Sequence, residues 1–299
     1  MKKTAENRYP HAATLFKFCK EALEIRYEGN VKVIDQDVGA ILNYDPADCS
    51  HWKKGKKNIR ALATLRSIAD HLAIDERLLI DIAAGKVTLE EAVFEYRGYG
   101  DFALHGKNLE NLKKEFFRNP AKWQPENSQN KTFEELFDID RSRIVEVAQT
   151  ILEKDVFTEA PIYIPEIFRL IPEVALSEDG SITQAVETVA QEGHGRPAFI
   201  IKYREMRPYT RFLLAKELFL CLVKIESGLF KDFKKSPQEV LEIQSNVFAG
   251  LILVPGTMLK KEVEMIDSSM DLVAQLAETF WVSKALMNQR LRDYLDQLN

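Results

Sequence analysis

The first candidate binding segment in the sequence is a cluster of positively charged residues that follows polar side chains. Five cations fall within eight residues: Lys53, Lys54, Lys56, Lys57 and Arg60. Ser50 and His51 precede this run. Lysines neutralise the phosphates of duplex DNA, and short polar side chains hydrogen-bond to base edges in a groove. The run predicts a DNA-binding segment, and the alternative is an ordinary solvated face of a helical bundle.

A carboxylate on an otherwise apolar helix is the second such feature. The apolar segment RFLLAKELFLCLVKIES, residues 211–227, is interrupted at Lys216, Glu217 and Lys224. A helix of this composition is expected to be buried on most sides. Because a buried lone carboxylate is costly, we expect Glu217 to hold an ion pair. Breaking such a pair from one side typically costs ~3–5 kcal/mol.

Two neighbours of Glu217 have alternative interpretations. Lys216 is expected to pair with Glu217, Glu242 or another acid, and the alternative is a surface lysine that extends its ammonium into water. Cys221 lies one turn after Glu217 and is the candidate nucleophile of a Cys/His hydrolase. On an apolar helix, a cysteine is more typical of inert core.

Short amphipathic helices are expected to position the basic run. Apolar periodicity predicts helices over His11–Tyr27, Asp35–Asn43, Pro46–Lys53, Ile59–Leu72 and Asp75–Ala84, with Thr88–Tyr96 as a further candidate. Asp45 can cap the helix that Pro46 begins, and Gly55 follows its end. Two short helices around a tight turn, with lysines after the second helix, suit docking in the major groove.

Composition divides the chain into a domain over residues 1–97, a linker over 98–137 and a second domain over 138–299. The linker combines Gly, aromatic and Pro-containing stretches, with one helix expected near Asn108–Phe117. In the second domain, helices are predicted over Arg141–Glu153, Phe212–Glu226, Pro237–Leu253, Met270–Phe280 and Lys284–Gln297, with a β-strand in GRPAFIIKY. The predicted fold class is mainly α: a five-helix N-terminal bundle and an α+β domain with a small sheet.

The N-terminal segment resembles the lambda-repressor-like (XRE) helix-turn-helix family. The matching positions are Gly39, Leu42, Ser50, Trp52, Gly55, Leu65, Ile68, Ala69 and Leu72. Two positions depart from the family pattern: Lys53 replaces a frequent Glu, and Asp35 replaces the usual Gln. The resemblance implies that base edges face Ala47, Asp48, Ser50 and His51, with phosphates at Lys53, Lys54, Lys56 and Lys57. It also implies that Trp52 belongs to the core.

The C-terminal domain resembles the ImmA/IrrE family of zinc-peptidase-like domains, which implies a zincin-like fold. The first family motif matches at Arg211, Phe212, Leu214, Ala215 and Glu217, and the second at Glu242, Asn246, Phe248, Ala249, Leu253 and Pro255. The two zinc-binding histidines of HExxH are replaced by Lys216 and Leu220, and the third-ligand acid by Gln244. We therefore expect no bound metal, no cofactor and no catalytic residue, with Glu217 and Lys216 as remnants.

Bulk composition limits the class of protein. The chain has 299 residues, 45% of them hydrophobic and 29% charged, which is ordinary for two globular domains. Its formal net charge of −5 restricts any nucleic-acid contact to a local patch. Three scattered cysteines, no secretory signal and no apolar stretch of membrane-spanning length predict a cytoplasmic protein with no membrane partner.

These features together predict a transcriptional regulator that binds double-stranded DNA. Its peptidase-like domain is expected to be inactive and to sense a small molecule, bind a protein or dimerise. Because symmetric DNA sites usually bind dimers, we expect a homodimer. One alternative is an active metallopeptidase that cleaves a repressor, with metal held by other ligands. Another is an antitoxin-like or phage-type partner protein.

Overall fold

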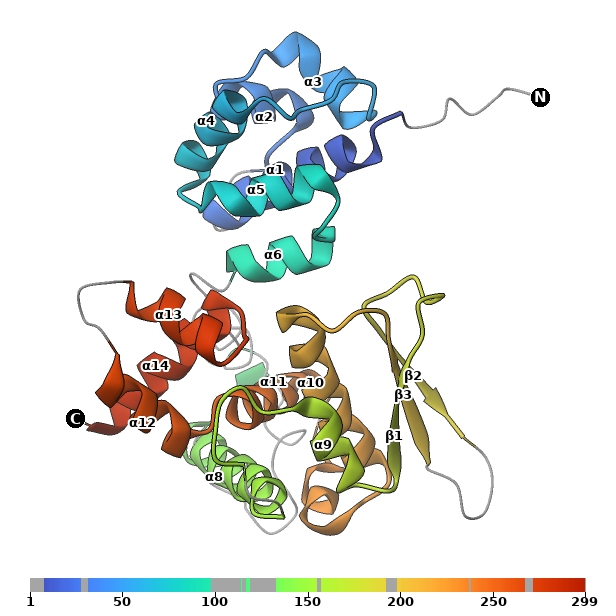
Figure 1. Cartoon of the computed structure of the whole chain (residues 1–299), viewed down its shortest axis with the longest axis vertical. Coiled ribbons are helices and arrows are strands. Elements are labelled where there is room, and N and C mark those ends of the chain that lie inside the picture. The colour runs from blue at the N-terminus through green and yellow to red at the C-terminus, as the bar shows by residue number, and fades with distance from the viewer. Residues whose placement is uncertain are drawn as a thin grey trace. The chain divides into compact units, whose positions relative to one another are not determined.

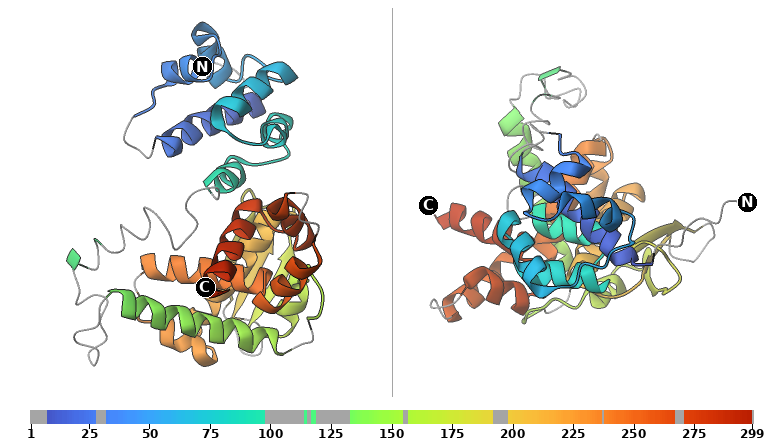
Figure 2. Two further views of the ribbon diagram at one scale, coloured as in Figure 1. Left: turned by 90° about the vertical axis from the view of Figure 1, so that its left-hand side faces the viewer. Right: turned by 90° about the horizontal axis from the view of Figure 1, so that it is seen from above.

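The computed structural model describes residues 8–27, 32–97, 114, 117–118, 133–154, 157–191, 198–236, 238–266 and 271–298. Contacts divide the chain into two compact units, Met1–Tyr99 and Gly100–Asn299 (Figures 1 and 2). Most of the helix predicted near Asn108–Phe117 lies outside the described residues.

The first unit is helical throughout its described part. Its helices are α1 (Pro10–Arg26), α2 (Asp35–Ile41), α3 (Pro46–Lys53), α4 (Leu62–Leu72), α5 (Glu76–Ala84) and α6 (Leu89–Arg97). The further candidate helix over Thr88–Tyr96 is confirmed as α6, so a sixth helix joins the five expected ones. It packs against α1 and α5. The helix expected from Ile59 begins three residues later, at Leu62.

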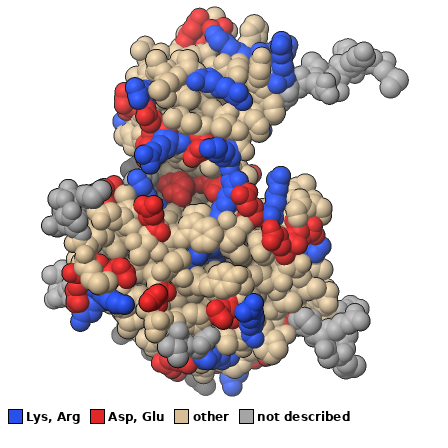
Figure 3. All heavy atoms as spheres, in the orientation of Figure 1, with Lys and Arg blue, Asp and Glu red and all other residues tan. Residues whose placement is uncertain are grey.

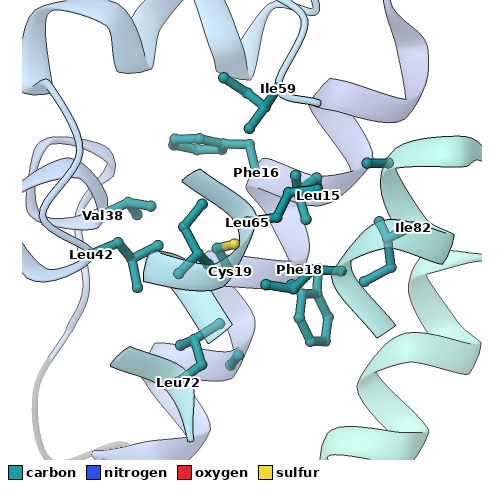
Figure 4. Packing of buried hydrophobic residues seen from close by; sticks show 14 of the residues in the cluster. Leu15, Phe16, Phe18, Cys19, Val38, Leu42, Ile59, Leu65, Leu72 and Ile82 are labelled. Carbon is teal, nitrogen blue, oxygen red and sulfur yellow. The ribbon is translucent and has the colours of Figure 1, made fainter. Parts of the chain in front are cut away.

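Helix α1 organises the core of this unit, since it contacts all five other helices. Its side chains Leu15, Phe16, Phe18 and Cys19 are fully buried or nearly so. Figure 4 shows them among apolar side chains from the other helices and the segment before α4: Val38, Leu42, Ile59, Leu65, Leu72 and Ile82. The apolar face of every short helix is therefore covered by α1 or a neighbour of α1, as the periodicity predicted.

The turn between α2 and α3 depends on a close approach at Gly39. A Cβ atom at this position would lie 2.7 Å from Cys49 Sγ and 2.9 Å from Pro46 Cα. The turn reverses at Asn43, whose φ is 52°. The Asp45 side chain then accepts a hydrogen bond from Ala47 N at 2.9 Å, which caps α3. The predicted cap and the predicted bounds of α3 are both confirmed.

The second unit combines helices with a small mixed sheet. Its helices are α8 (Phe133–Leu152), α9 (Ile164–Arg169), α10 (Pro208–Lys224), α11 (Gln238–Leu253), α12 (Gly256–Met265), α13 (Leu272–Thr279) and α14 (Lys284–Leu298), with a 3₁₀ helix η2 (Gly228–Phe233). The sheet contains β1 (Val174–Glu178), β2 (Val186–Ala190) and β3 (Phe199–Tyr203). This arrangement confirms the predicted fold class.

Strand β3 lies at the centre of the sheet, parallel to β1 and antiparallel to β2. Helix α10 contacts all three strands and packs against α11, which in turn contacts α8 and α14 (Figures 1 and 2). Ten residues of α10 are buried, so its enclosure is confirmed.

The predicted boundaries of the second unit need two corrections. Helix α8 begins at Phe133 rather than Arg141, so the expected end of the linker at residue 137 falls inside a helix. Strands β1 and β2 and helices α9 and α12 were not predicted. The two strands are five residues long and half-exposed along much of their length, which leaves little alternation to read.

Within the described residues, no single helix has both the length and the apolar character needed to cross a bilayer. Val240–Leu253 and Gly256–Met265 reach the required length and composition only as a pair bent by 49°. Buried core helices give the same signal.

The packing at Gly39 leads to a prediction whose sign opposes helix propensity. In an exposed helix interior, replacing Gly by Ala stabilises by about 1 kcal/mol. At Gly39 the new methyl group meets a backbone atom, and overpacking costs about 1–3 kcal/mol. We expect Gly39→Ala to lower the free energy of unfolding measured with urea.

Its control is Ala40→Gly at the exposed neighbouring position of α2, where propensity alone acts and predicts a loss of about 1 kcal/mol. A Gly39→Ala protein more stable than the unmodified chain would contradict the close approach of α2 and α3.

Candidate functional site

Helix α3 presents one buried and one exposed face. Cys49 and Trp52 point into the core, and Trp52 has no exposed surface. Its ring lies 5.1 Å from both the Phe16 and the Tyr44 rings in edge-on contacts. Trp52 is therefore a core residue, as the sequence predicted.

The opposite face of α3 carries the predicted readers of base edges. Ala47, Ser50, His51 and Lys54 are all exposed. Their spacing of i, i+3, i+4 and i+7 places them on one side of the helix. The side chains Ala47 and Ser50 are small, so another molecule can approach the backbone of α3 closely. The structure thus brings together three of the four predicted readers.

Asp48, the fourth predicted reader, is half-buried and forms an ion pair with Lys57. This contact raises the pKa of Lys57, with a smaller contribution from the Tyr44 hydroxyl. The Lys57 ammonium also lies 5.5 Å from the centre of the Tyr44 ring. Asp48 therefore pairs with a lysine that follows α3 in its own domain. The sequence did not predict this contact.

A second acid holds another lysine of the basic run. Asp35, at the start of α2, pairs with Lys53 and accepts a hydrogen bond from Lys20 at 3.0 Å. Lys53 makes the larger contribution to lowering the pKa of Asp35, followed by Lys20. Asp35 and Lys53 are the two residues that differ from the pattern described above, and the charge of one neutralises the charge of the other.

Lys54 and Lys56 are exposed, and neither has a carboxylate partner in the described part of the chain. Figure 3 shows both positive and negative side chains on the end of the first unit that carries α3. The predicted basic patch is accordingly a mixed surface on which two of four lysines are already paired.

In the second unit, α10 carries the two remnants of the expected peptidase motif. Lys216 Nζ forms an ion pair with Glu242 on α11, and its side chain is 14% exposed. Glu217 Oε2 accepts a hydrogen bond from Thr188 Oγ1 on β2 at 2.8 Å. Glu242 is thus the acid, among the alternatives considered, that pairs with Lys216. The expected ion pair of Glu217 is replaced, among the described residues, by a hydrogen bond from a neutral hydroxyl.

The remaining positions of the motif carry no acid or imidazole. Leu220 is half-buried, and Gln244 is buried, with its Nε2 atom 3.4 Å from Ser236 Oγ. Burial, with a smaller contribution from the charge of Glu217, raises the pKa of Cys221 to about 12. Cys221 is therefore protonated at neutral pH, which is unfavourable for a nucleophile.

Zinc does not fit these positions. It requires deprotonated imidazole, thiolate or carboxylate ligands in tetrahedral arrangement. The ammonium of Lys216 and the hydrocarbon of Leu220 supply none. In the described part of the chain, no group of three His, Cys, Asp or Glu side chains is placed to hold a metal ion.

Arg211 is a buried cation whose surroundings the sequence did not reveal. Its side chain donates to Ile162 O at 2.9 Å, and its guanidinium lies 4.8 Å from the centre of the Trp281 ring. Burial lowers the pKa of Arg211 to about 10. Arg211 therefore joins the start of α10 to the segment before α9 and to the turn after α13.

Comparison with known proteins identifies part of the second unit. Residues 181–292 match the family model of the IrrE N-terminal-like domain, Peptidase_M78. The chain therefore carries an IrrE-like peptidase-family domain, and the matched segment extends from the turn before β2 into α14. No curated protein matches the chain. No solved structure matches it either.

The side chains of Lys216, Leu220 and Gln244 offer no zinc ligand, so we predict that the protein retains far less than one equivalent of zinc per chain after dialysis. The measurement is metal content by mass spectrometry on the full chain. Stoichiometric zinc that is lost in the Glu217→Ala or Glu242→Ala variant would show that these acids form a metal site with other ligands.

The contact between Thr188 and Glu217 gives a prediction on stability. Thr188→Val keeps the shape of a β-branched side chain but removes the hydroxyl donor. We expect the free energy of unfolding to fall by about 1.5 kcal/mol, the lower end of the range for a hydrogen bond to a charged group, because both residues are half-buried. Thr188→Ser retains the hydroxyl and is the matched control. A loss as large as ~3–5 kcal/mol in Thr188→Val would indicate the buried charge network first expected around Glu217.

Proposed function

We propose that the protein is a DNA-binding transcriptional regulator whose IrrE-like domain does not catalyse peptide hydrolysis. The single observation that carries the proposal is the exposed face of α3, made of Ala47, Ser50 and His51 and followed by Lys54 and Lys56. A short capped helix with small side chains in the middle of its exposed face and lysines at its end fits the major groove. The resemblance to XRE helix-turn-helix domains supports the same assignment.

The distribution of charge along the chain supports the N-terminal unit as the DNA-binding part. Residues 1–99 contain 16 Lys or Arg and 15 Asp or Glu, whereas residues 100–299 contain 25 and 31. The negative net charge of the protein therefore belongs to the second part. A polyanion is repelled less by the first part, where the basic run lies.

In the proposed complex, base edges face Ala47, Asp48, Ser50 and His51, and phosphates contact the four lysines. Lys54 and Lys56 can bind phosphates directly. Lys53 and Lys57 first have to leave Asp35 and Asp48, so their contributions to affinity are smaller. A symmetric duplex site would engage two copies of the chain, and a homodimer is part of the proposal.

The inactive state of the IrrE-like domain is supported by Lys216 and Leu220 at the two histidine positions. Glu217 alone has no metal-bound water to activate. We propose that this domain instead senses an effector or binds a partner. The three cysteines are free and buried, which suits the cytoplasm as the location in this proposal.

The first test separates phosphate contacts from general charge. Lys54→Ala with Lys56→Ala should weaken binding to every duplex and lower the slope of log affinity against log salt by about two units. The control is Arg77→Ala with Lys86→Ala, which removes the same charge from α5 and from the segment after it. This variant should leave the salt slope unchanged. The measurement is fluorescence anisotropy of the full chain on duplex DNA at several salt concentrations.

If both double variants lost the same affinity and salt slope, the loss would come from net charge alone. That result would contradict a phosphate-binding face at Lys54 and Lys56. Failure of the unmodified chain to bind any duplex selected from a random library would overturn the DNA-binding proposal. Peptide cleavage that depends on added zinc would favour the alternative, an active peptidase.

The second test concerns sequence readout. Ser50→Ala or His51→Ala should flatten the preference at one or two base pairs, with about 1–3 kcal/mol lost for each well-placed contact. The salt slope should stay the same, because neither substitution removes a lysine of the basic run. Sequencing of DNA selected by each variant measures the preference, and Ser67→Ala on α4 serves as a control. Unchanged preferences in both variants would contradict the assignment of α3 as the reading helix.

A further inference from the structure

A cavity in the second unit lies away from the former peptidase motif. It has a volume of about 150 Å³ and opens among α8, the segment between α9 and β1, the end of α10 and η2. Leu222 of α10 lines it, six residues after Lys216 and so about 9 Å farther along the helix axis. The cavity is therefore separate from the Lys216–Glu242 pair.

The inner wall of the cavity is apolar. Its buried lining side chains include Val147 and Ile151 of α8, Ile171, Leu222 and Phe230. An apolar cavity of this volume is large enough to take benzene. Water gains few hydrogen bonds in such a space, so an apolar group of benzene size is the favoured occupant.

The mouth of the cavity carries both signs of charge. Lys154 and Glu173 line it and are exposed, and neither has a side-chain partner among the residues that the structure describes. The Thr150 hydroxyl donates its hydrogen to Glu146 O at 2.9 Å, which leaves its lone pairs as acceptors for a donor at the mouth. Leu229, 39% exposed, extends the apolar surface outwards.

We propose that this cavity binds a free amino acid with an apolar side chain of about benzene size. The side chain fills the apolar interior, the α-carboxylate contacts Lys154, and the α-ammonium contacts Glu173 and the Thr150 hydroxyl. One cation and one anion at the mouth of a single apolar cavity match a zwitterion better than a ligand with one charge. The site goes beyond the DNA-binding proposal and does not depend on it.

The test uses the full chain with labelled isoleucine methyl groups, so that Ile151 and Ile171 report on the cavity by NMR. L-Phenylalanine should shift both signals in a saturable manner. 3-Phenylpropionate lacks the ammonium and phenethylamine lacks the carboxylate, and each should bind roughly two- to five-fold more weakly, as expected for an exposed ion pair. Glycine should shift neither signal.

Four variants locate the site. Thr150→Trp places an indole at the mouth and should abolish the shifts, whereas Gln149→Trp, at the adjacent exposed position of α8, should preserve them. Lys154→Gln should weaken L-phenylalanine and 3-phenylpropionate but leave phenethylamine unchanged. Glu173→Gln should weaken L-phenylalanine and phenethylamine but leave 3-phenylpropionate unchanged.

Two results would overturn the proposal. Absence of any shift at Ile151 and Ile171 would show that the cavity does not take the ligand. Equal affinity for L-phenylalanine and both analogues, unaffected by Lys154→Gln and Glu173→Gln, would show a purely apolar cavity. DNA affinity measured on the same protein is a separate readout, so failure of either proposal is distinguishable from failure of the other.

Discussion

The enclosure of α10 is the constraint on which the second unit depends. The helix is covered by the sheet on one side and by α11 on another, and ten of its residues are buried. A charged side chain on a helix in this position needs polar partners within the protein, because burial removes its contacts with water. Lys216 and Glu217 are consequently each tied to a different neighbour, Glu242 on α11 and Thr188 on β2.

Ion pairs and hydrogen bonds of buried or half-buried cations join the elements around α10. Here the ammonium of Lys216 joins α10 to α11 through Glu242, and Arg211 and Arg290 add further ties. Arg290 donates to Val254 O at 3.0 Å, which joins α14 to the residue after α11, and it pairs with Asp293 of its own helix at 3.2 Å. Cations of the protein itself therefore join these elements.

Local signals in the sequence predicted the bounds of α3 but not the ion pairs of the lysines in and after this helix. Asp45, Pro46 and Gly55 each act through neighbouring backbone atoms, so the bounds of α3 could be predicted from spacing alone. The partners of Lys53 and Lys57 lie 18 and 9 residues earlier, and the partner of Lys216 lies 26 residues later. Such pairs depend on how helices pack, which periodicity does not specify. The short strands β1 and β2 were missed for the same reason, because their pairing with β3 stabilises them.

The carboxylates of Asp35 and Asp48 also bear on how quickly the first unit would meet a polyanion. Encounter rates depend on the electric field at a distance, whereas residence depends on contacts made after arrival. Two lysines whose charges are cancelled within the protein add little to that field. For a nucleic-acid ligand, the face around α3 would therefore attract through Lys54 and Lys56, and the encounter rate would be lower than for a face with four unpaired lysines. This face would distinguish its ligands by their dissociation rates. Only a ligand that displaces the carboxylates of Asp35 and Asp48 would contact all four lysines.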